Sequence, residues 1–524
     1  MQTQLNEPNP ASATPDEGPV SDVDRLYDSH SLGDHRRAVQ MLLDRQSDRL
    51  GANPDPARPK VEVSIEPDLP SLAWLCRISA GNRCAISVGP GVEFGRHRLF
   101  EGVWDGDFGK GAFQESQYVY GSGVTWRGQL VFVPPKHGWE YLFVLHDAGE
   151  RTSFVSNSMN FALERAGIDP DGPFFAGIET ALFDKTNAAT AAGIDKYDPL
   201  VMTDGRFSLT RMMFYNFTAD ADGRIRPIES LPEAPFKDFA SCRRFLMDKI
   251  SAIGANATDR RRQRPLPPIT PVSGGYDSAC VAVLAAEAGF RDAATIDVTV
   301  KGRDDSGAAL AERLGMTIVR AEHILGKIVP SLEVIFDGPL KRLLYEFVAT
   351  PGVGDDVAFL ALEQALIGRT FLSGAMGDSI WRRNSSLPPG LPVRVVYGKS
   401  LTEFRLRAGF AFVPVPSIGA RFPRRVKRIT RSPEMAPYTL HAPYDRPIAR
   451  RIIEESDIPR GSFAAAKLAV SPHPQNHRAL FREAVAATRQ RYRPAGPRHA
   501  QPGFFASGRQ SFARLLGLRR LARW

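Results

Sequence analysis

The sequence predicts a mixed α/β protein whose C-terminal half contains a parallel sheet. Between residues 269 and 320, short segments alternate as strand, helix, strand, helix and strand, and both helices end at a glycine. This order is typical of a parallel α/β sheet. Before residue 235, short runs of period two are separated by Gly and Pro, which is typical of antiparallel strands. With 43% apolar residues among 524, the chain can bury a core, and wholesale disorder is excluded.

Four segments with different compositions follow one another along the chain. Residues 1–60 are rich in Pro, Asn, Asp and Ser, which cannot bury enough apolar surface to offset their ordering entropy, so we predict a disordered arm. Residues 61–235 contain runs such as RCAISV and WEYLFVLH and predict an α+β domain of mainly antiparallel strands. Residues 236–485 carry the parallel α/β pattern, and residues 486–524 form a basic tail.

The elements of the parallel sheet can be placed from glycine and cap positions. The expected order is a strand at 269–273, a helix at 279–288, a strand at 295–300, a helix at 307–314 and a strand at 317–320. Asp355 or Asp356 can cap a helix that runs to residue 367, and Gly368 then precedes a strand at 370–372. Pro271 cannot donate to a sheet ladder, so we expect it where its strand is ending.

The first strand of this pattern runs into the loop Ser273-Gly274-Gly275-Tyr276-Asp277-Ser278, and a helix starts at once. Two glycines let the backbone turn tightly, the loop amides face outward, and two hydroxyls add donors, so the loop can bind an anion. The carboxylate of Asp277 would repel a bare phosphate and suits a site in which Mg²⁺ lies between carboxylate and phosphates. An ordinary strand-to-helix turn capped by Asp277 or Ser278 is the simpler alternative, but the full hexapeptide favours a phosphate loop.

The loop resembles the SGGxDS pyrophosphate loop of N-type ATP pyrophosphatases. Residues 265–475 as a whole resemble the synthetase domain of asparagine synthetase. FLSGAMGDS stands where that family has a strand and a GEGGDE loop, and APYDRPIARR stands where it has a segment beginning PFLD that also supplies a lysine. The resemblance implies an ATP pyrophosphatase fold, with ATP and Mg²⁺ bound beyond the carboxyl ends of the strands.

The resemblance also implies a role for individual residues. The expected nucleotide-binding residues are Val272, Ser273, Gly274, Gly275, Asp277, Ser278, Val298 and Gly374, with Val272 and Val298 beside the adenine. Asp277 and Asp378 would bind the metal, and Asp378 and Lys467 are the expected catalytic residues. Lys467 would neutralise the leaving pyrophosphate, although a solvated lysine on a helix face is an equally good interpretation.

Two departures from the family limit the resemblance. The glutamate of GEGGDE is replaced by Ala375, which cannot do acid-base work, and the last acidic position is Ser379. Tyr345 and Glu346 are weak candidates for the missing base and more naturally belong to a helix. The family's glutaminase domain needs an N-terminal cysteine, whereas the first cysteine here is Cys76. Residues 61–235 therefore resemble a degenerate glutaminase (Ntn)-like domain, and ammonia from glutamine is disfavoured.

The expected function is that of a ligase that adenylates a small or peptidic carboxylate with ATP, releases pyrophosphate, and joins the carboxylate to an amine as an amide or lactam. The alternative is a non-catalytic ATP-binding scaffold derived from the same fold, which the replaced glutamate and the missing cysteine would suit.

The charge distribution argues against nucleic acid as the partner. The formal net charge is +9, and residues 481–524 alone hold ten Arg and one Glu, so the charge lies outside the expected enzyme. An acidic partner for this tail remains an alternative. The basic stretch 421–431 reads as a solvated face rather than an anionic cleft. No apolar run is long enough to span a membrane, and four cysteines without CxxC spacing give no disulfide framework, so a cytoplasmic location is expected.

Overall fold

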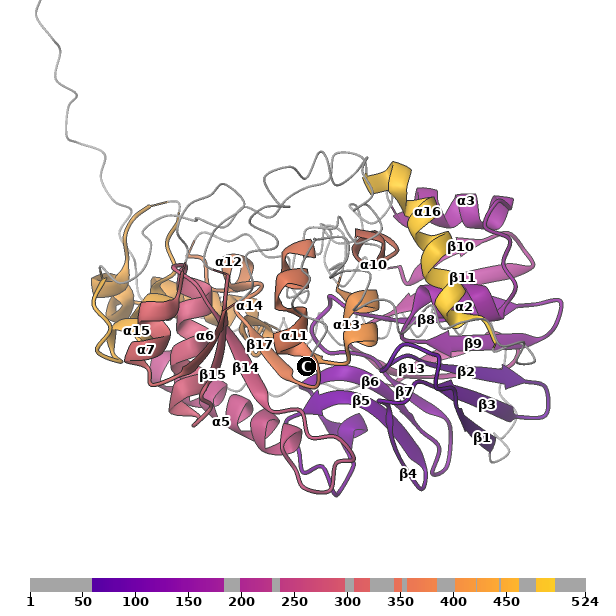
Figure 1. Cartoon of the computed structure of the whole chain (residues 1–524), viewed down its shortest axis with the longest axis horizontal. Coiled ribbons are helices and arrows are strands. Elements are labelled where there is room, and N and C mark those ends of the chain that lie inside the picture. The colour runs from indigo at the N-terminus through magenta and orange to yellow at the C-terminus, as the bar shows by residue number, and fades with distance from the viewer. Residues whose placement is uncertain are drawn as a thin grey trace, which may run out of the picture.

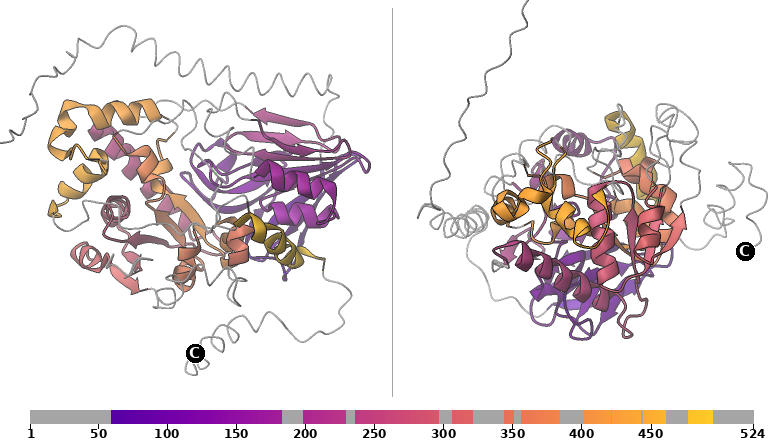
Figure 2. Two further views of the ribbon diagram at one scale, coloured as in Figure 1. Left: turned by 90° about the horizontal axis from the view of Figure 1, so that it is seen from above. Right: turned by 90° about the vertical axis from the view of Figure 1, so that its left-hand side faces the viewer.

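The computed structural model describes residues 59–182, 198–228, 236–296, 306–320, 344–350, 356–383, 401–420, 422–442, 444–460 and 477–494. Its fold is mixed α/β and contains three sheets, two from the N-terminal half of the chain and one from the C-terminal half (Figure 1). The strand-rich half and the parallel sheet lie side by side in all views (Figures 1 and 2). Within the described residues, every helix is too short or too polar to cross a membrane.

The first sheet has seven strands in the order β1-β3-β2-β9-β8-β11-β10. Its strands are β1 (Lys60–Ile65), β2 (Trp74–Ser79), β3 (Arg83–Val88), β8 (Leu142–Asp147), β9 (Thr152–Ser156), β10 (Leu200–Thr203) and β11 (Phe207–Met212). All neighbours are antiparallel except β1 and β3, which pair in parallel. The expected antiparallel character of this half is confirmed. β1 begins at Lys60, the last residue of the expected disordered arm, and residues 1–58 lie outside the described part.

The second sheet has six strands in the order β13-β12-β7-β6-β5-β4. Its strands are β4 (Glu93–Gly95), β5 (Arg98–Trp104), β6 (Val119–Thr125), β7 (Val131–Val133), β12 (Asn216–Ala219) and β13 (Ile225–Ile228). One core cluster draws alternate side chains from both sheets, among them Trp74, Ile86, Val144, Phe132 and Phe217. The two sheets therefore pack face to face, as the period-two pattern of apolar residues requires.

Helices cover the outer faces of these two sheets. The helices α2 (Met159–Arg165), α3 (Pro173–Thr180) and α16 (His477–Arg489) lie together beside the first sheet (Figure 1), and α5 (Phe239–Ala257) packs on β5 of the second. The short helix η10 (Gln490–Tyr492) follows α16, and Tyr492 is fully buried. Residues 486–492, expected to belong to the basic tail, are instead packed against the strand-rich half up to Tyr492. Residues 495–524 lie outside the described part.

The third sheet is the parallel one, with the order β16-β15-β14-β17-β18. Its strands are β14 (Pro268–Val272), β15 (Asp292–Thr295), β16 (Thr317–Arg320), β17 (Thr370–Ser373) and β18 (Ala411–Pro414), and each neighbouring pair is parallel. The strand expected at 295–300 was placed too late, because β15 follows directly after the glycine turn that ends α6 (Tyr276–Glu287). Residues 297–300 lie outside the described part. Pro271 lies one residue before the end of β14, where it is in register with Ala294 of β15 while pairing with β17 has already stopped at Ile269.

The remaining helices are short and connect or flank the sheets. They are η1 (Phe113–Glu115), α7 (Ala308–Arg313), α10 (Tyr345–Val348), η6 (Val357–Leu362), α11 (Glu363–Leu366), α12 (Gly377–Ile380), α13 (Thr402–Ala408), η7 (Val415–Ser417), α14 (Pro423–Arg431), η8 (Pro433–Tyr438) and α15 (Pro447–Glu454). The single helix expected before Gly368 is a 3₁₀ segment followed by one α turn. Gly368 has the expected left-handed conformation, with φ of +68°.

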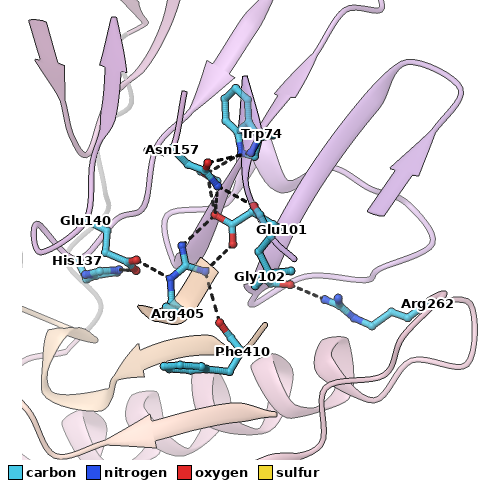
Figure 3. A network of polar contacts seen from close by, with 11 residues as sticks. Trp74, Glu101, Gly102, His137, Glu140, Asn157, Arg262, Arg405 and Phe410 are labelled. Atoms are coloured by element: carbon cyan, nitrogen blue, oxygen red, sulfur yellow. Dashed lines mark hydrogen bonds and ion pairs between the residues drawn. The ribbon is translucent and has the colours of Figure 1, made fainter. Parts of the chain in front are cut away.

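A buried ionic network joins α13 to the strand-rich half (Figure 3). The guanidinium of Arg405 donates to Glu140 (2.5 Å) and to both carboxylate oxygens of Glu101 (2.7 and 3.1 Å), and all three side chains are at most 2% exposed. Asn157 and Ser122 also donate to Glu101, at 3.3 and 2.8 Å. A buried arginine that pairs with two buried carboxylates ties residues about 300 positions apart in the chain.

The two carboxylates of this network differ in acidity. Burial raises the pKa of Glu101 above its ordinary value despite the opposing charge of Arg405. Burial acts in the same direction on Glu140, but Arg405 and His137 outweigh it and lower the pKa of that carboxyl. The ring of His137 lies 3.3 Å from Glu140 and stacks on Tyr120. Nearby, Arg262 donates to the carbonyl of Gly102 at 3.0 Å (Figure 3).

Candidate functional site

The loop after the central strand β14 forms a compact turn at the carboxyl edge of the parallel sheet. The Ser273 and Ser278 hydroxyls lie 2.6 Å apart, and the Gly275 amide donates to Ser273 Oγ at 3.3 Å. Ser278 in turn donates to the Gly275 carbonyl at 3.1 Å. Two hydroxyls therefore converge where α6 begins, and the edge of the sheet at which they lie is where α/β proteins bind ligands.

Two other segments cross this loop in backbone contact. A Cβ added to Gly374 would lie 2.5 Å from the carbonyl carbon of Asp277 and 2.7 Å from the Ser278 nitrogen. A Cβ on Gly377 would overlap the Asp277 carboxylate, and one on Gly307 would lie 2.6 Å from the nitrogen of Ser273. These contacts hold three parts of the chain together around residues 273–278, and packing against backbone requires the glycines at positions 307 and 374.

Gly275 differs from these three glycines. Its φ is −87°, which any residue can adopt, and an added Cβ would meet no heavy atom closer than 3.6 Å. It is also the residue before α6, a position where Ser, Thr, Asp or Asn would stabilise the helix, and it gives α6 no side-chain cap. Neither the backbone nor the packing of the described residues requires a glycine here, whereas close approach of a ligand would.

The carboxylate of Asp277 pairs with Arg446, the residue that precedes helix α15. Arg446 Nη1 donates to Asp277 Oδ2, and the Arg446 side chain is 4% exposed. The Arg446 guanidinium also lies 4.4 Å from the ring centre of Tyr444, which stacks on Tyr276 at 5.1 Å. The next turn of α15 adds a second buried arginine, Arg450, which donates to the Tyr276 hydroxyl.

The two tyrosines of this cluster stay neutral near pH 7. Burial raises the pKa of Tyr444 to about 12, with the positive charge of Arg446 opposing it. Burial likewise raises the pKa of Tyr276, against the attraction of Arg450. Both hydroxyls are therefore hydrogen-bonding groups rather than bases, and the charged groups around the loop include the two arginines, Asp277, and the carboxylates of Asp445 and Glu454, which also raise the pKa of Tyr276.

The residues present fit a magnesium-bound nucleotide. Asp277 lies in the first turn of α6, and Asp378 lies exposed in the first turn of α12, directly after the glycine that abuts the Asp277 carboxylate. Oxygen ligands of this kind suit Mg²⁺, which usually takes one or two carboxylates and completes its shell with phosphates and water. In the described part of the chain, no three His, Cys, Asp or Glu side chains cluster as a metal site of their own. A metal here would therefore need the ligand's oxygens.

The other residues expected at the site have different outcomes. Val272 is buried at the end of β14 and lies so close to Gly307 that a Cβ added to this glycine would be 2.6 Å from the Val272 Cβ. Among the described residues, the Val272 side chain therefore contributes to packing. Val298 and Lys467 lie outside the described residues. Ala375 lies in the loop after β17, and its amide donates to Ser373 Oγ at 3.1 Å.

Tyr345 and Glu346 lie in helix α10, as the simpler interpretation expects. The Tyr345 hydroxyl donates to Glu483 of α16, and Glu346 accepts from Arg407 and Arg491. Burial opposes ionisation of Glu346, but the two arginines outweigh it and lower its pKa. These contacts give both residues a role in docking α16 and α13.

Sequence reasoning missed the arginine that faces the loop. Arg446 belongs to the APYDRPIARR stretch, and Pro447 after it starts α15, which fixes the direction in which the chain enters the helix. A charged residue just before a proline-led helix is a weak signal, because it fits a solvated cap equally well. Only the packing of α15 on α6 shows that it is buried.

No known protein-family model matches this chain, and no curated protein matches it.

Proposed function

We propose that this protein is an ATP-dependent, AMP-forming ligase that activates a substrate carboxylate and joins it to an amine. In this proposal the parallel sheet is an ATP pyrophosphatase fold of asparagine synthetase type, preceded by a degenerate glutaminase-like part. The observation that carries the proposal is the loop of residues 273–278 at the carboxyl edge of the central strand. It combines hydroxyls, a carboxylate and a glycine that the fold itself does not need.

The residues of the loop divide the work between phosphate and metal. Phosphate oxygens would accept hydrogen bonds from Ser273, Ser278 and the first amides of α6. The start of a helix favours such anionic ligands because its first amides are free to donate. Asp277 and Asp378 would hold Mg²⁺, which would neutralise charge on the phosphates during the transfer. Gly275 would let the phosphate approach the backbone. Lys467, from a segment outside the described residues, would add a positive charge.

The reaction would proceed in two steps. Attack of the substrate carboxylate oxygen on the α-phosphorus of ATP forms an acyl-adenylate and releases pyrophosphate. The amine then attacks the acyl carbon, AMP leaves, and the amine loses a proton. Because Ala375 cannot accept that proton, the chain contributes mainly positioning and electrostatic stabilisation. The reaction would take place in the cytoplasm, with a small or peptidic carboxylate as substrate.

A non-catalytic ATP-binding scaffold is the second candidate. The observations that favour it are the alanine at position 375 and the pairing of the metal-binding carboxylate Asp277 with Arg446. Both candidates require nucleotide binding at the loop, and they differ only in turnover.

The two candidates can be separated by product analysis. The full chain is incubated with ATP, Mg²⁺ and a panel of carboxylic acids and amines, and AMP, ADP and pyrophosphate are quantified. The ligase predicts AMP and pyrophosphate in equal amounts with at least one acid, and a strong loss of both in Asp277→Asn. Asp171→Asn, an exposed carboxylate in the strand-rich half, is the matched control and should keep full activity. ADP formation, or an unchanged rate in Asp277→Asn, contradicts the ligase. Tight ATP binding without turnover supports the scaffold.

A further inference from the structure

Arg446 is a buried cation next to the candidate phosphate loop. Its side chain is 4% exposed, and its carboxylate partner is Asp277, which the proposed function assigns to the metal. Arg446 Nη1 donates to Asp277 Oδ2, so Mg²⁺ on either oxygen of this carboxylate would set two cations on one anion. Binding of Mg²⁺ to this carboxylate would therefore weaken the ion pair and leave a guanidinium that is buried and only partly neutralised.

A buried charge without a partner is costly, so such a guanidinium needs another anion nearby. The phosphates that accompany Mg²⁺ would supply it at the same place. Arginine suits this exchange, because its planar guanidinium binds carboxylates and phosphates with the same paired donors. The resting partner Asp277 and the phosphate would thus be alternative ligands of one residue.

The surroundings of Arg446 hold it in position for this exchange. Tyr444 lies under its guanidinium, with the Tyr444 hydroxyl 3.5 Å from Arg446 Nη1. That hydroxyl also lies 3.6 Å from where a Cβ would sit on Gly275, so the tyrosine contacts the loop itself. Pro447 starts α15 immediately afterwards, and α15 packs along α6. The side chain is therefore fixed beside residues 275–277 before any ligand arrives.

A second arginine shares this position. Arg450 is 2% exposed and contacts the Tyr276 hydroxyl and ring, and its buried Nε has no hydrogen-bond partner among the described residues. Two buried guanidinium groups on one face of α15 thus lie against the first turn of α6. Asp445 and Glu454 also act on Tyr276, so engagement of Asp277 by a metal would shift the balance of charge at this edge toward the two arginines.

We propose that Arg446 binds the pyrophosphate portion of the nucleotide, and that it transfers from Asp277 to the phosphates when Mg²⁺ occupies Asp277. This inference rests on the proposed function and adds a phosphate-binding residue that lies outside the loop. In the resting protein, the same arginine keeps the Asp277 carboxylate neutralised. The residue would contact the two phosphates that leave as pyrophosphate and would not contact AMP.

The test measures binding rather than turnover. Isothermal titration calorimetry of the full chain with ATP, pyrophosphate and AMP, each with Mg²⁺, is carried out on the wild type, Arg446→Gln, Arg446→Lys and Arg451→Gln. Arg451 lies on the same helix, is 19% exposed, pairs with Glu434 and Glu455 instead of Asp277, and is the matched control. Thermal melting of each variant shows whether it is folded.

The expected result is specific to the leaving phosphates. Arg446→Gln should weaken ATP and pyrophosphate binding by about 10-fold to 100-fold, the loss expected for a charge-assisted contact, and leave AMP binding unchanged. Arg446→Lys should recover part of the loss, and the Arg451 variant should bind like the wild type. A second readout is the Mg²⁺ concentration that gives half-maximal ATP binding, measured for Arg446→Lys and Arg446→Gln. This concentration should be lower for Arg446→Gln than for Arg446→Lys, because in the glutamine variant Asp277 has lost the cation that competes with Mg²⁺.

Two negative outcomes are distinguishable. If the wild type binds ATP and pyrophosphate and Arg446→Gln binds both equally well, the inference about Arg446 is wrong and the proposed function stands. An equal loss for ATP, pyrophosphate and AMP in a folded variant would also overturn it, since that indicates general support of the site. If the wild type binds none of the three, the proposed function itself is wrong.

Discussion

Replacement of Arg405 by methionine should destabilise the protein more than any exposed ion pair could. Arg405 is 1% exposed and neutralises Glu101 and Glu140, which are 0% and 2% exposed. Methionine keeps much of the apolar volume and removes the charge, so two carboxylates remain buried with their positive partner gone. His137 stays beside Glu140, so the variant destabilises the ionised form of Glu101 more than that of Glu140.

The size of the effect follows from the proton that Glu101 must then bind. An ordinary glutamate pKa of about 4.3 and a cost of about 1.4 kcal/mol per pH unit give about 4 kcal/mol for protonation at pH 7. This agrees with the about 3–5 kcal/mol expected when one partner of a buried ion pair is removed. The Arg405→Met variant should therefore lose about 4 kcal/mol of unfolding free energy near pH 7.

The same reasoning fixes the pH dependence. With Arg405 gone, the pKa of Glu101 in the folded state lies above its value in the unfolded state. The folded variant then binds more protons, so its stability rises as the pH falls from about 7 toward 5. The deficit relative to the wild type should shrink by about 1.4 kcal/mol per pH unit for each carboxylate that is protonated.

Urea unfolding followed by circular dichroism at pH 7 and pH 5 measures both quantities. Arg151→Met is the control, because Arg151 is 67% exposed in its pair with Asp222 and should cost less than about 1 kcal/mol. Adding Glu101→Gln and Glu140→Gln to Arg405→Met should recover part of the lost stability. A deficit below about 1 kcal/mol at pH 7, or one that grows at pH 5, would refute the reasoning.

Three further results are expected. Gly374→Ala should lower the melting temperature and weaken ATP binding, because the added methyl group would clash with the backbone of Asp277. An unchanged melting temperature in differential scanning calorimetry would contradict the close contact between Gly374 and the loop. Tyr492→Phe should cost about 1.5–3 kcal/mol in urea unfolding, because its hydroxyl donates to the buried Glu403 at 2.5 Å, and wild-type stability would contradict this. Since the pKa of Glu346 is lowered in the fold, its ion pairs stabilise the protein above pH about 4.3, and this stabilisation is lost as the pH falls below that value. The unfolding free energy of Glu346→Gln should therefore fall less in acid than that of the wild type. Equal pH dependence of the two unfolding free energies would contradict this.

The sequence predicted the parallel sheet and the strand-to-helix turn at residues 273–278 well because both depend on local chemistry. Apolar runs of strand length, glycine helix ends and the SGGYDS loop are each read within a few residues. The placement of β15 failed because the apolar stretch 295–300 is as good a strand as 292–295, and only pairing with Pro271 and Thr317 selects the earlier register.

The contacts that shape the candidate site could not be read in this way. Arg446 lies 169 positions from Asp277, and Gly374 meets the loop only through the order of the strands. The start of the basic tail was misplaced for a related reason. The Arg-rich composition of the C-terminal segment suggested that residues 486–492 are solvated. Instead, Arg489 pairs with Glu164, Arg491 pairs with Glu346, and Tyr492 is buried. Composition cannot show that distant carboxylates lie opposite these arginines.

Binding of ATP to the wild type and to Gly275→Ala tests the central claim most directly. The glycine has an ordinary φ and room for a methyl group in the described fold, and the poorer helix cap offered by alanine opposes its entropy gain, so the variant should fold and melt close to the wild-type temperature. If the loop binds the phosphates of ATP, calorimetry with Mg²⁺ should show binding by the wild type and at least about tenfold weaker binding by the variant. Equal ATP affinity in the two proteins would place the nucleotide elsewhere and contradict the account.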